Sequence, residues 1–217
     1  KHAEIIAEYG GIPVIADIDL SRLDDTIQHL NNNYCSDCCS VVVDITNADS
    51  VKNLLNTVIS RYGRIDGLIN NAAHNPKVDS NADSFNESSR FECFPLETWF
   101  RDINVGLTGA FICSQIIGNA MAKNRRGVIL NIASDLGVVA PDQRIYRKEG
   151  LADEQQPVKP VTYSVVKHGI VGLTKYLATY WADKNVRVNA LSPGGIYVNQ
   201  PADFVRRLIQ LIPLGRM

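Results

Sequence analysis

The chain of 217 residues is long enough for one large α/β domain, and its formal net charge of −1 provides no strongly basic surface for nucleic acid or a membrane. Hydrophobic residues make up 45% and charged residues 21% of the sequence, as in ordinary globular proteins. No apolar run approaches the roughly 20 residues that a membrane-spanning helix needs. Five cysteines, an odd number, favour a reducing cytoplasm over a disulfide framework. We therefore expect a cytoplasmic domain that binds neither nucleic acid nor membrane.

Strand-like and helix-like patterns alternate along the chain. Residues 1–9 have the pattern of a helix that ends at Gly10 and Gly11. Strands are predicted at residues 12–16, 41–43, 66–70, 127–133 and 186–191. Helices are predicted at residues 21–30, 51–62, 95–122, 162–183 and 201–211, with Ser21 as the N-cap of the first. This alternation predicts a three-layer α/β fold of Rossmann type, in which a doubly wound parallel sheet carries helices on both faces.

Two connections are unusually long, residues 74–94 and residues 135–161. Both leave the carboxyl edge of the predicted sheet, where open α/β sheets bind their ligands. Long loops in compact domains are often lids, so we expect both insertions to lie over an active site. An oligomer contact or a disordered excursion is the alternative. The second loop carries side chains that suit a polar, anionic substrate: Asp142, Gln143, Arg144, Tyr146, Arg147 and Lys148.

Tyr163 and Lys167 stand four residues apart in a predicted helix, so their side chains lie on one face, one turn apart. A phenol is a weak acid or base near neutral pH, because its unperturbed pKa is about 10. An ammonium group within a few ångströms favours the phenolate, which makes such a pair a candidate device for proton transfer. Because this spacing also arises often by chance, the pair alone decides little.

Polar and small residues follow several predicted strands and would meet at one edge of the sheet. These are the turn Asn70-Asn71-Ala72-Ala73, Ser134, and the turn Ser192-Pro193-Gly194-Gly195. Asn104 lies inside the long helical stretch of residues 95–122. Together with the Tyr163 and Lys167 pair, they give one candidate site several polar groups besides the proton-transfer pair.

In this order, the motifs resemble the short-chain dehydrogenase/reductase family over essentially the whole chain. The resemblance implies an oxidoreductase that transfers a hydride between a nicotinamide and a hydroxyl or carbonyl carbon. It also implies a catalytic tetrad, made of Asn104, Ser134, Tyr163 and Lys167. In oxidation, Tyr163 as phenolate would take the hydroxyl proton, while Lys167 would hold the nicotinamide ribose. Ser134 would donate a hydrogen bond to the substrate oxygen.

The fourth member of the implied tetrad, Asn104, would bend its helix and hold a water that links Lys167 to solvent. Each of the two smaller members has a simpler alternative. Ser134 could merely cap a turn, and Asn104 could be a buried amide with no catalytic part. His74 follows the Asn-Asn-Ala turn and could face the substrate, although a loop histidine more often faces solvent.

An acid ends each of the first two predicted strands. Asp17 would accept hydrogen bonds from the adenosine ribose and repel a 2′-phosphate, and no arginine directly follows it, so NAD(H) is favoured over NADP(H). Asp19 is a rival for this role. By the resemblance Asp44 would lie near the adenine, although it could instead start a helix. The resemblance implies further cofactor contacts at Ile18, Ile45, Asn71, Ala72, Ile132, Tyr163, Lys167, Pro193, Gly194 and Ile196.

The chain departs from the family pattern in three places. The family's Gly-rich turn, whose backbone amides hold the pyrophosphate, is not found in the sequence, nor is the last strand. We therefore expect residues 1–217 to be a single domain, recorded incompletely at both ends of a longer protein. Ala73 replaces the usual glycine of the Asn-Asn-Ala turn, a minor change.

The polar second loop favours a sugar, a sugar acid or a polyol as the small-molecule substrate, over a steroid or a long acyl chain. By the resemblance, the two long helices would form homodimers or homotetramers. The rival interpretations are an extended-branch nucleotide-sugar epimerase or dehydratase and a non-catalytic dehydrogenase-like binding protein. The segment Cys35-Ser36-Asp37-Cys38-Cys39 could form half of a zinc site, but no second pair of cysteines follows, so we expect no metal.

Overall fold

The computed structural model describes residues 1–34, 37–74 and 89–217. Its strands are β1 (Val14–Asp17), β2 (Cys39–Val42), β3 (Gly67–Asn70), β4 (Gly127–Ile132) and β5 (Val186–Leu191). Its helices are α1 (His2–Glu8), α2 (Leu20–Asn33), α3 (Ala48–Tyr62), α5 (Leu96–Ile103), α6 (Gly109–Lys123), α7 (Val161–Tyr180) and α8 (Ala202–Ile209). Strands and helices alternate as predicted, and the α/β class is confirmed.

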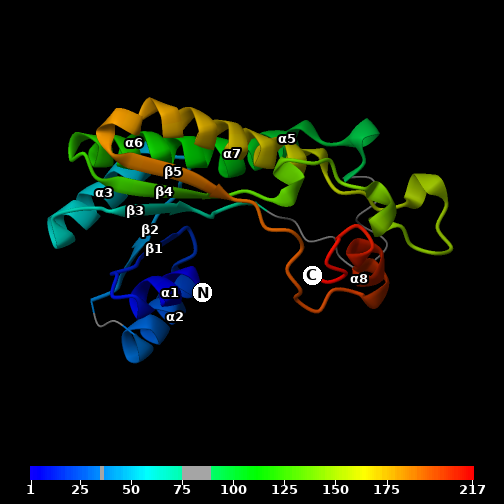
Figure 1. The fold of residues 1–217 in the computed structure, drawn as a ribbon, viewed down its shortest axis with the longest axis horizontal. Helices are drawn as coiled ribbons and strands as arrows, with labels where there is room; N and C mark the ends of the chain where they lie inside the picture. Colours follow the sequence, from blue (N-terminus) through cyan, green and yellow to red (C-terminus); the bar gives the residue numbers. More distant parts are fainter. Residues whose placement is uncertain (35–36, 75–88) are drawn as a thin grey trace.

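All of the strand pairs are parallel, but the described residues form two sheets instead of one. β1 pairs with β2, and β4 lies between β3 and β5. No ladder joins the two sheets within the described residues, because β1 and β3 do not pair with each other. Figure 1 shows the β1–β2 sheet, with α1 and α2, on the β3 side of the larger sheet and away from β5. The predicted three-layer α/β fold is confirmed, and its parallel strands lie in these two sheets within the described residues.

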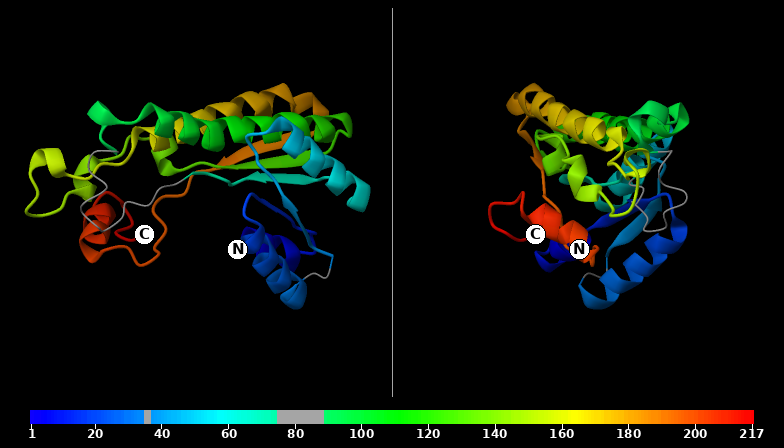
Figure 2. Two further views of the ribbon diagram at one scale, coloured as in Figure 1. Left: turned by 180° about the vertical axis from the view of Figure 1, so that it is seen from behind. Right: turned by 90° about the vertical axis from the view of Figure 1, so that its right-hand side faces the viewer.

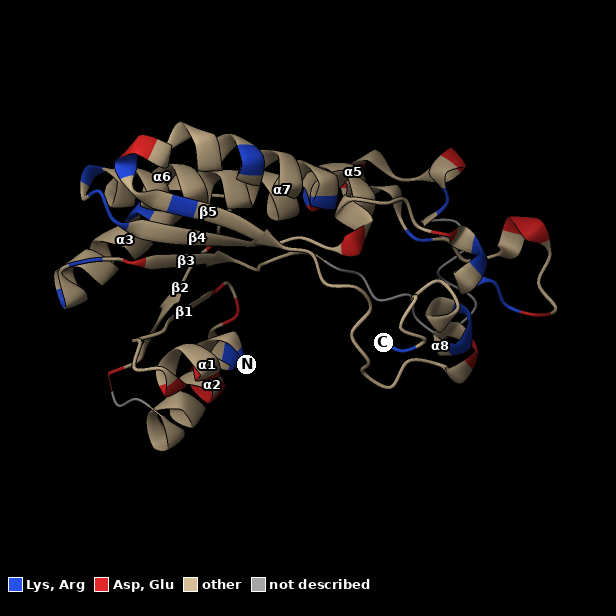
Figure 3. Cartoon of the chain, viewed as in Figure 1, with Lys and Arg blue, Asp and Glu red and all other residues tan. Residues whose placement is uncertain are grey.

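Helices α6 and α7 run along the three-stranded sheet (Figures 1 and 2). α6 packs on β3 and β4, and α7 packs on β4 and β5. Between them lies the core, whose most deeply buried side chains include Ile117, Met121 and Ile129. Figure 3 shows few charged residues along these helices and many more on the loop after β4 and near α8. The apolar composition of α6 and α7 thus supplies the packing that holds β3, β4 and β5 in place.

A buried polar network crosses the middle of this core. Asn131 on β4 is fully buried, and its Nδ2 donates to Thr174 Oγ1 at 2.8 Å. Its Oδ1 accepts from Asn70 Nδ2 at 2.8 Å, and that same amide donates to Ser114 Oγ at 3.0 Å. Because each buried polar group has a partner, the network fixes β3, β4, α6 and α7 relative to one another.

The predicted N-cap of α2 is wrong by two residues. Asp19 is the N-cap, with extended backbone angles, and its carboxylate accepts from the backbone amides of Ser21 and Arg22. Aspartate and serine both favour this position, and only the backbone angles decide which side chain reaches the free amides. The strand predicted at residues 12–16 begins at Val14, after Pro13.

The helix predicted at residues 95–122 is interrupted. A π-helical turn, Asn104–Thr108, separates α5 from α6. By length and composition alone, the stretch Leu96–Lys123 could cross a membrane, with a mean hydropathy of 1.4 in its most apolar window. The expectation that no stretch reaches this length is therefore wrong. In the structure this stretch packs on β3, β4 and α3, as the core helix of a sheet protein does.

The connection of residues 135–161 contains three short 3-10 turns, Asp135–Gly137, Gln143–Tyr146 and Asp153–Gln155. Its far end is tied by Gln156, whose side-chain amide bonds both backbone groups of Lys148 and the carbonyl of Leu151. Most of the other insertion, and the residues Cys35 and Ser36 of the cysteine segment, lie outside the described residues. The predictions that depend on them stay predictions.

Candidate active site

A cavity of about 690 Å³ opens at the carboxyl ends of β3, β4 and β5. Parts of the 135–161 loop and of α8 form one side of it. The two are joined where the rings of Tyr146 and Phe204 pack at 5.5 Å and Arg207 Nε donates to the carbonyl of Ile145 at 3.1 Å. The second insertion therefore lies at the cavity.

Of the polar loop side chains, Asp142 and Tyr146 line the cavity. Burial raises the pKa of Tyr146 to about 12, so its hydroxyl stays protonated at neutral pH and can donate a hydrogen bond. Arg144 is turned to solvent and paired with Asp142, whose pKa this hydrogen bond lowers to about 2. Arg147 is exposed and paired with Asp153. The loop therefore presents only part of its charge to the cavity.

Tyr163 and Lys167 both line the cavity from the first turns of α7. The Lys167 ammonium lies 5.8 Å from the centre of the Tyr163 ring. Its Nζ donates to the carbonyl of Ile132 at 2.8 Å, which ties α7 to the end of β4. Burial lowers the pKa of Lys167, since desolvation disfavours the charged form. A phenol and an ammonium are thus held together on one wall.

Ser134 is buried at the end of β4 and lines the same cavity. Its Oγ donates to the carboxylate of Asp135 at 2.7 Å and accepts from the amide of Leu136 at 3.2 Å. The hydroxyl caps a turn in this state, as one of the two interpretations of the sequence foresaw. To donate to a substrate oxygen, it must exchange the bond to Asp135.

The structure does not bring Asn104 to the cavity. Asn104 is exposed and begins the π turn, whereas Asp102 and Gly106 of the same helix line the cavity wall. Residues four apart on a helix share a face, and a residue midway between them points elsewhere. Of the four tetrad residues that the resemblance implies, three share the cavity wall.

The expected cofactor contacts fall into two groups. Asn71, Ile132, Pro193, Gly194 and Ile196 line the cavity, and Ala72 does not. The other group lies outside the cavity, where β1 and β2 end: Asp17, Ile18, Asp44 and Ile45.

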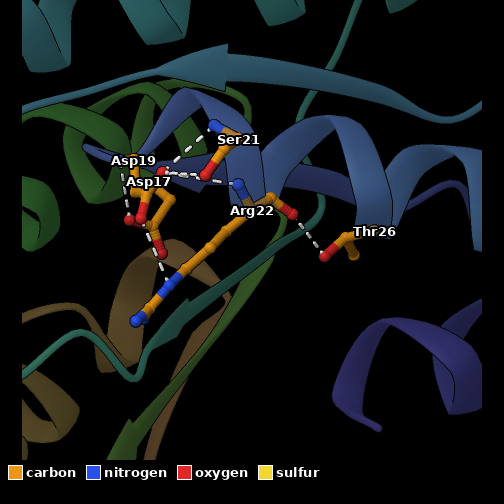
Figure 4. A network of polar contacts seen from close by, with 5 residues as sticks. All are labelled: Asp17, Asp19, Ser21, Arg22 and Thr26. Carbon is orange, nitrogen blue, oxygen red and sulfur yellow. Dashed lines mark hydrogen bonds and ion pairs between the residues drawn. The ribbon is translucent and has the colours of Figure 1, made fainter.

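Asp17 and Asp19 have different roles at the end of β1 (Figure 4). Asp19 uses its carboxylate to cap α2 and to pair with Arg22 at 3.2 Å, and hydrogen bonding from Ser21 lowers its pKa. Asp17 is exposed and accepts one hydrogen bond through Oδ1, from the amide of Asp19 at 3.0 Å. Its other carboxylate oxygen remains available to a ribose hydroxyl. Arg22, which sequence reasoning did not consider, brings a cation close to this position.

Asp44 and Ile45 are used within the fold. The Asp44 carboxylate accepts from the amide and hydroxyl of Thr46, at 2.9 and 2.7 Å, in the turn before α3. The cap of α3 itself is Asn47. Ile45 packs against Gly109, where an added Cβ would come within 2.5 Å of its Cδ1.

Sequence reasoning missed two groups at the cavity. Asp102 is buried, accepts from Thr162 Oγ1 at 2.6 Å and lies 2.8 Å from His74 Nδ1. Lys159 lies just ahead of α7, with its ammonium 3.7 Å from the centre of the Tyr163 ring. In the sequence, Lys159 precedes Tyr163 by four positions, just as Lys167 follows it by four. This spacing could have pointed to Lys159.

Comparison with known proteins identifies the family. A family model described as enoyl-(acyl carrier protein) reductase matches residues 1–217. The chain belongs to the short-chain dehydrogenase/reductase family. Two solved structures are similar to this chain in fold. The protein gox2181 matches with a TM-score of 0.80 and 25% identity, over 98% of this chain and 75% of that one. A short chain dehydrogenase from Bacillus anthracis matches with a TM-score of 0.78 and 28% identity, over 99% and 76%.

Curated short-chain dehydrogenase/reductase relatives have different activities. A 3-oxoacyl-(acyl-carrier-protein) reductase of Synechocystis is 30% identical, over 82% of this chain and 61% of the relative. Glucose 1-dehydrogenase 2 of Bacillus subtilis is 33% identical, over 85% and 62%. An NAD-dependent glycerol dehydrogenase of Listeria innocua is 30% identical, over 99% and 74%. The chain spans less than two thirds of the first two proteins, and the family membership alone does not select a substrate.

Proposed function

We propose that the protein is an NAD(P)(H)-dependent oxidoreductase that transfers a hydride between a nicotinamide and the hydroxyl or carbonyl carbon of a small polar substrate. One observation carries the proposal: Ser134, Tyr163 and Lys167 line one wall of one cavity. A bound nicotinamide supplies the carbon that accepts or donates the hydride. The side chains of this chain manage the proton and the charge on the substrate oxygen.

In the oxidation direction, the Tyr163 oxygen takes the proton of the substrate hydroxyl group. Lys167 supports the charge on that oxygen, because its ammonium is held 5.8 Å from the ring centre by the carbonyl of Ile132. Ser134 exchanges its bond with Asp135 for one with the substrate oxygen and stabilises the charge that develops there. Asn104 keeps the role that the resemblance implies only as a proposal, because it is outside the cavity wall.

The residues present fit a dinucleotide. The available oxygen of Asp17 suits a ribose hydroxyl, and the polar groups of Asn71 and Lys167 line the cavity beside the backbone of Pro193 and Gly194. Asp17 favours NAD(H), since its charge repels a 2′-phosphate. Arg22 opposes this preference, but Asp19 already pairs with it. The NAD-dependent glycerol dehydrogenase among the relatives supports the same preference.

A sugar, sugar acid or polyol is the substrate class that the site supports best. Asp142, Tyr146 and Lys159 supply polar and charged groups to the cavity, and a glucose dehydrogenase and a glycerol dehydrogenase are among the relatives. Turnover of such substrates by the full-length protein, followed as a stoichiometric change in free NADH, tests the proposal. An epimerase would recycle bound cofactor without that change, and a binding protein would give no turnover at all.

We also propose that the protein is a cytoplasmic homodimer or homotetramer held through its long helices. Large aromatic side chains are exposed on them, and include Phe100 (65%), Phe111 (46%), Tyr176 (62%) and Tyr180 (60%). Exposed aromatic rings on weakly charged helices are typical of contacts between subunits. Cys39 and Cys113 are free thiols, which suits a reducing compartment. Light scattering would compare the molecular mass in solution of Tyr176→Glu with that of the wild-type protein and so test the contact. Cell fractionation would test the location.

A further inference from the structure

Lys159 is a second ammonium at the reacting tyrosine. Its Nζ lies 3.7 Å from the centre of the Tyr163 ring, and Lys167 Nζ lies 5.8 Å from it. Lys159, Tyr163 and Lys167 all line the cavity, together with Ser134. A group that binds in front of Ser134 and Tyr163 therefore comes close to the Lys159 cation.

No negative side chain in the described part of the chain forms an ion pair with the Lys159 ammonium, and it makes no hydrogen bond there. Burial lowers its pKa to about 8; Lys167 adds to this effect, and Asp135 opposes it. Removing an ammonium group from water carries a free-energy cost, which the contact with the Tyr163 ring offsets only in part. An anion that enters the cavity would supply an ionic partner and recover more of that cost.

The position of Lys159 is fixed by the loop. Its backbone amide donates to Gln143 Oε1 at 2.8 Å, and its carbonyl accepts from Gln143 Nε2 at 3.4 Å. The next residue, Pro160, fixes the backbone that leads into α7 and restricts Lys159 as well. The backbone that carries Lys159 is therefore fixed before any ligand arrives, and its ammonium rests on the Tyr163 ring.

The start of α7 adds to the positive field. This helix has 20 residues and no side-chain cap at Pro160, so its positive dipole end adjoins Lys159. Three acids line the cavity: Asp142, paired with Arg144, Asp135, bonded to Ser134, and Asp102, bonded to Thr162. All three carboxylates are already engaged by the fold.

We propose that Lys159 binds an anionic group of the substrate, a carboxylate or a phosphate, next to the carbon that reacts at Tyr163. The proposed anion site rests on the proposed oxidoreductase function and narrows its substrate class. Sugar acids or sugar phosphates are the substrates, and neutral polyols are poor substrates. Lys159 is the residue that determines this specificity, and Gln143 positions it.

The test compares three probes of matched carbon chain with the full-length protein and NAD(H): gluconate, sorbitol and sorbitol 6-phosphate. The wild-type protein should bind or turn over at least one anionic probe about tenfold better than sorbitol. Comparison of gluconate with sorbitol 6-phosphate shows whether the site prefers a carboxylate or a phosphate. Lys159→Met should remove that preference through KM, raising the KM of the anionic probe about tenfold relative to that of sorbitol. Lys159→Arg should retain most of the preference for the anionic probe. Lys175→Met, an exposed change on the same helix, is the control.

Equal KM values for anionic and neutral probes in the wild type would overturn the proposal. An equal loss of kcat for all three probes in Lys159→Met would also overturn it, because Lys159 would then act on Tyr163 and not on the substrate. Dissociation constants measured by calorimetry with NADH bound give the same comparison without turnover. Absence of turnover with retained anion selectivity would refute the oxidoreductase function and leave the anion site standing.

Discussion

Thr162 donates its hydroxyl proton to the buried carboxylate of Asp102 at 2.6 Å, across 60 residues of sequence. Thr162 directly precedes Tyr163, and the same carboxylate lies 2.8 Å from His74 Nδ1. One buried acid thus connects α5, the first turn of α7 and the segment that follows the Asn-Asn-Ala turn. This connection anchors the first turn of α7, which carries Tyr163.

Removing the Asp102 carboxylate should destabilise the protein. Asp102→Ala leaves the Thr162 hydroxyl and His74 without their partner, which should cost about 1–3 kcal/mol. For a protein of this size, each kcal/mol lowers the melting temperature by about 2–4 °C. Asp102→Asn keeps one acceptor oxygen and should lose less, so a thermal melt of both variants separates the hydrogen bond from the charge. Equal stability of wild type and Asp102→Ala would contradict the role given to this carboxylate.

Tyr163→Phe should lower turnover by about 100-fold or more, because general acid–base groups contribute about that much to rate. Binding of NADH should change little, since the ring and its packing remain. Steady-state kinetics measures the turnover, and a titration that follows the fluorescence of bound NADH measures the binding. A variant that kept full turnover would show that Tyr163 is not the proton acceptor.

Asp17→Ser should change the cofactor preference. The variant loses the acceptor for the ribose and the charge that repels a 2′-phosphate, so the ratio of NADPH to NADH affinity should rise by about tenfold or more. Asp25→Ala, an exposed change on α2, is the matched control. If both variants leave the ratio unchanged, Asp17 is only a residue of the turn.

Anion binding at Lys159 should weaken at alkaline pH. The lysine pKa of about 8 means that the ammonium is charged below that value and neutral above it. The dissociation constant for gluconate should therefore be lowest below about pH 7 and rise above about pH 9. Other charged or titratable side chains line the same cavity as Lys159, namely His74, Asp102, Asp135, Asp142, Tyr146, Tyr163 and Lys167, and Arg90 and Glu92 line the neighbouring pocket that it also reaches.

Two variants isolate the contribution of Lys159 to that pH profile. Lys159→Arg stays charged throughout this range and should keep binding at high pH, since arginine titrates above 12. Lys159→Met should give weak binding at every pH. A wild-type profile identical to that of Lys159→Arg would assign the titration to another group.

Asn131→Ala should be among the most damaging changes in the core. It would leave the side chains of Asn70 and Thr174 without the partner that the fully buried amide provides, and it would open a cavity. Such changes cost about 2–4 kcal/mol. Chemical denaturation measures the loss, with Asn53→Ala, on α3, as a control at the surface.

Local patterns predicted much of this fold, and contacts between distant segments account for most of what was missed. The strand predicted at residues 186–191 is bounded by polar turns, and β5 has those limits. Ser134 was placed at the end of a strand because apolar periodicity is a local signal. Asp102 gave no such signal, because its partner Thr162 lies 60 residues away.

The N-cap of α2 was within reach of the sequence, because Asp19 and Ser21 are both favoured capping residues. The lining of the cavity by Asp102 and Gly106 was not, because the sequence does not show which face of their helix meets the cavity. Lys159 repeats the four-residue spacing of Tyr163 and Lys167, but its ring contact depends on how Gln143 folds the loop.

Asp17 ends a strand of one sheet, whereas Pro193 follows a strand of the other, and no ladder joins the two within the described residues. A dinucleotide that touched both would add a further bridge between two sheets that the packing of one hydrophobic core already joins. Part of its binding free energy would then be spent on holding the fold: at 100 times its dissociation constant a ligand adds about 2.7 kcal/mol of stability. The supply of cofactor would then govern how long each molecule survives heat and proteases, as well as how fast it works.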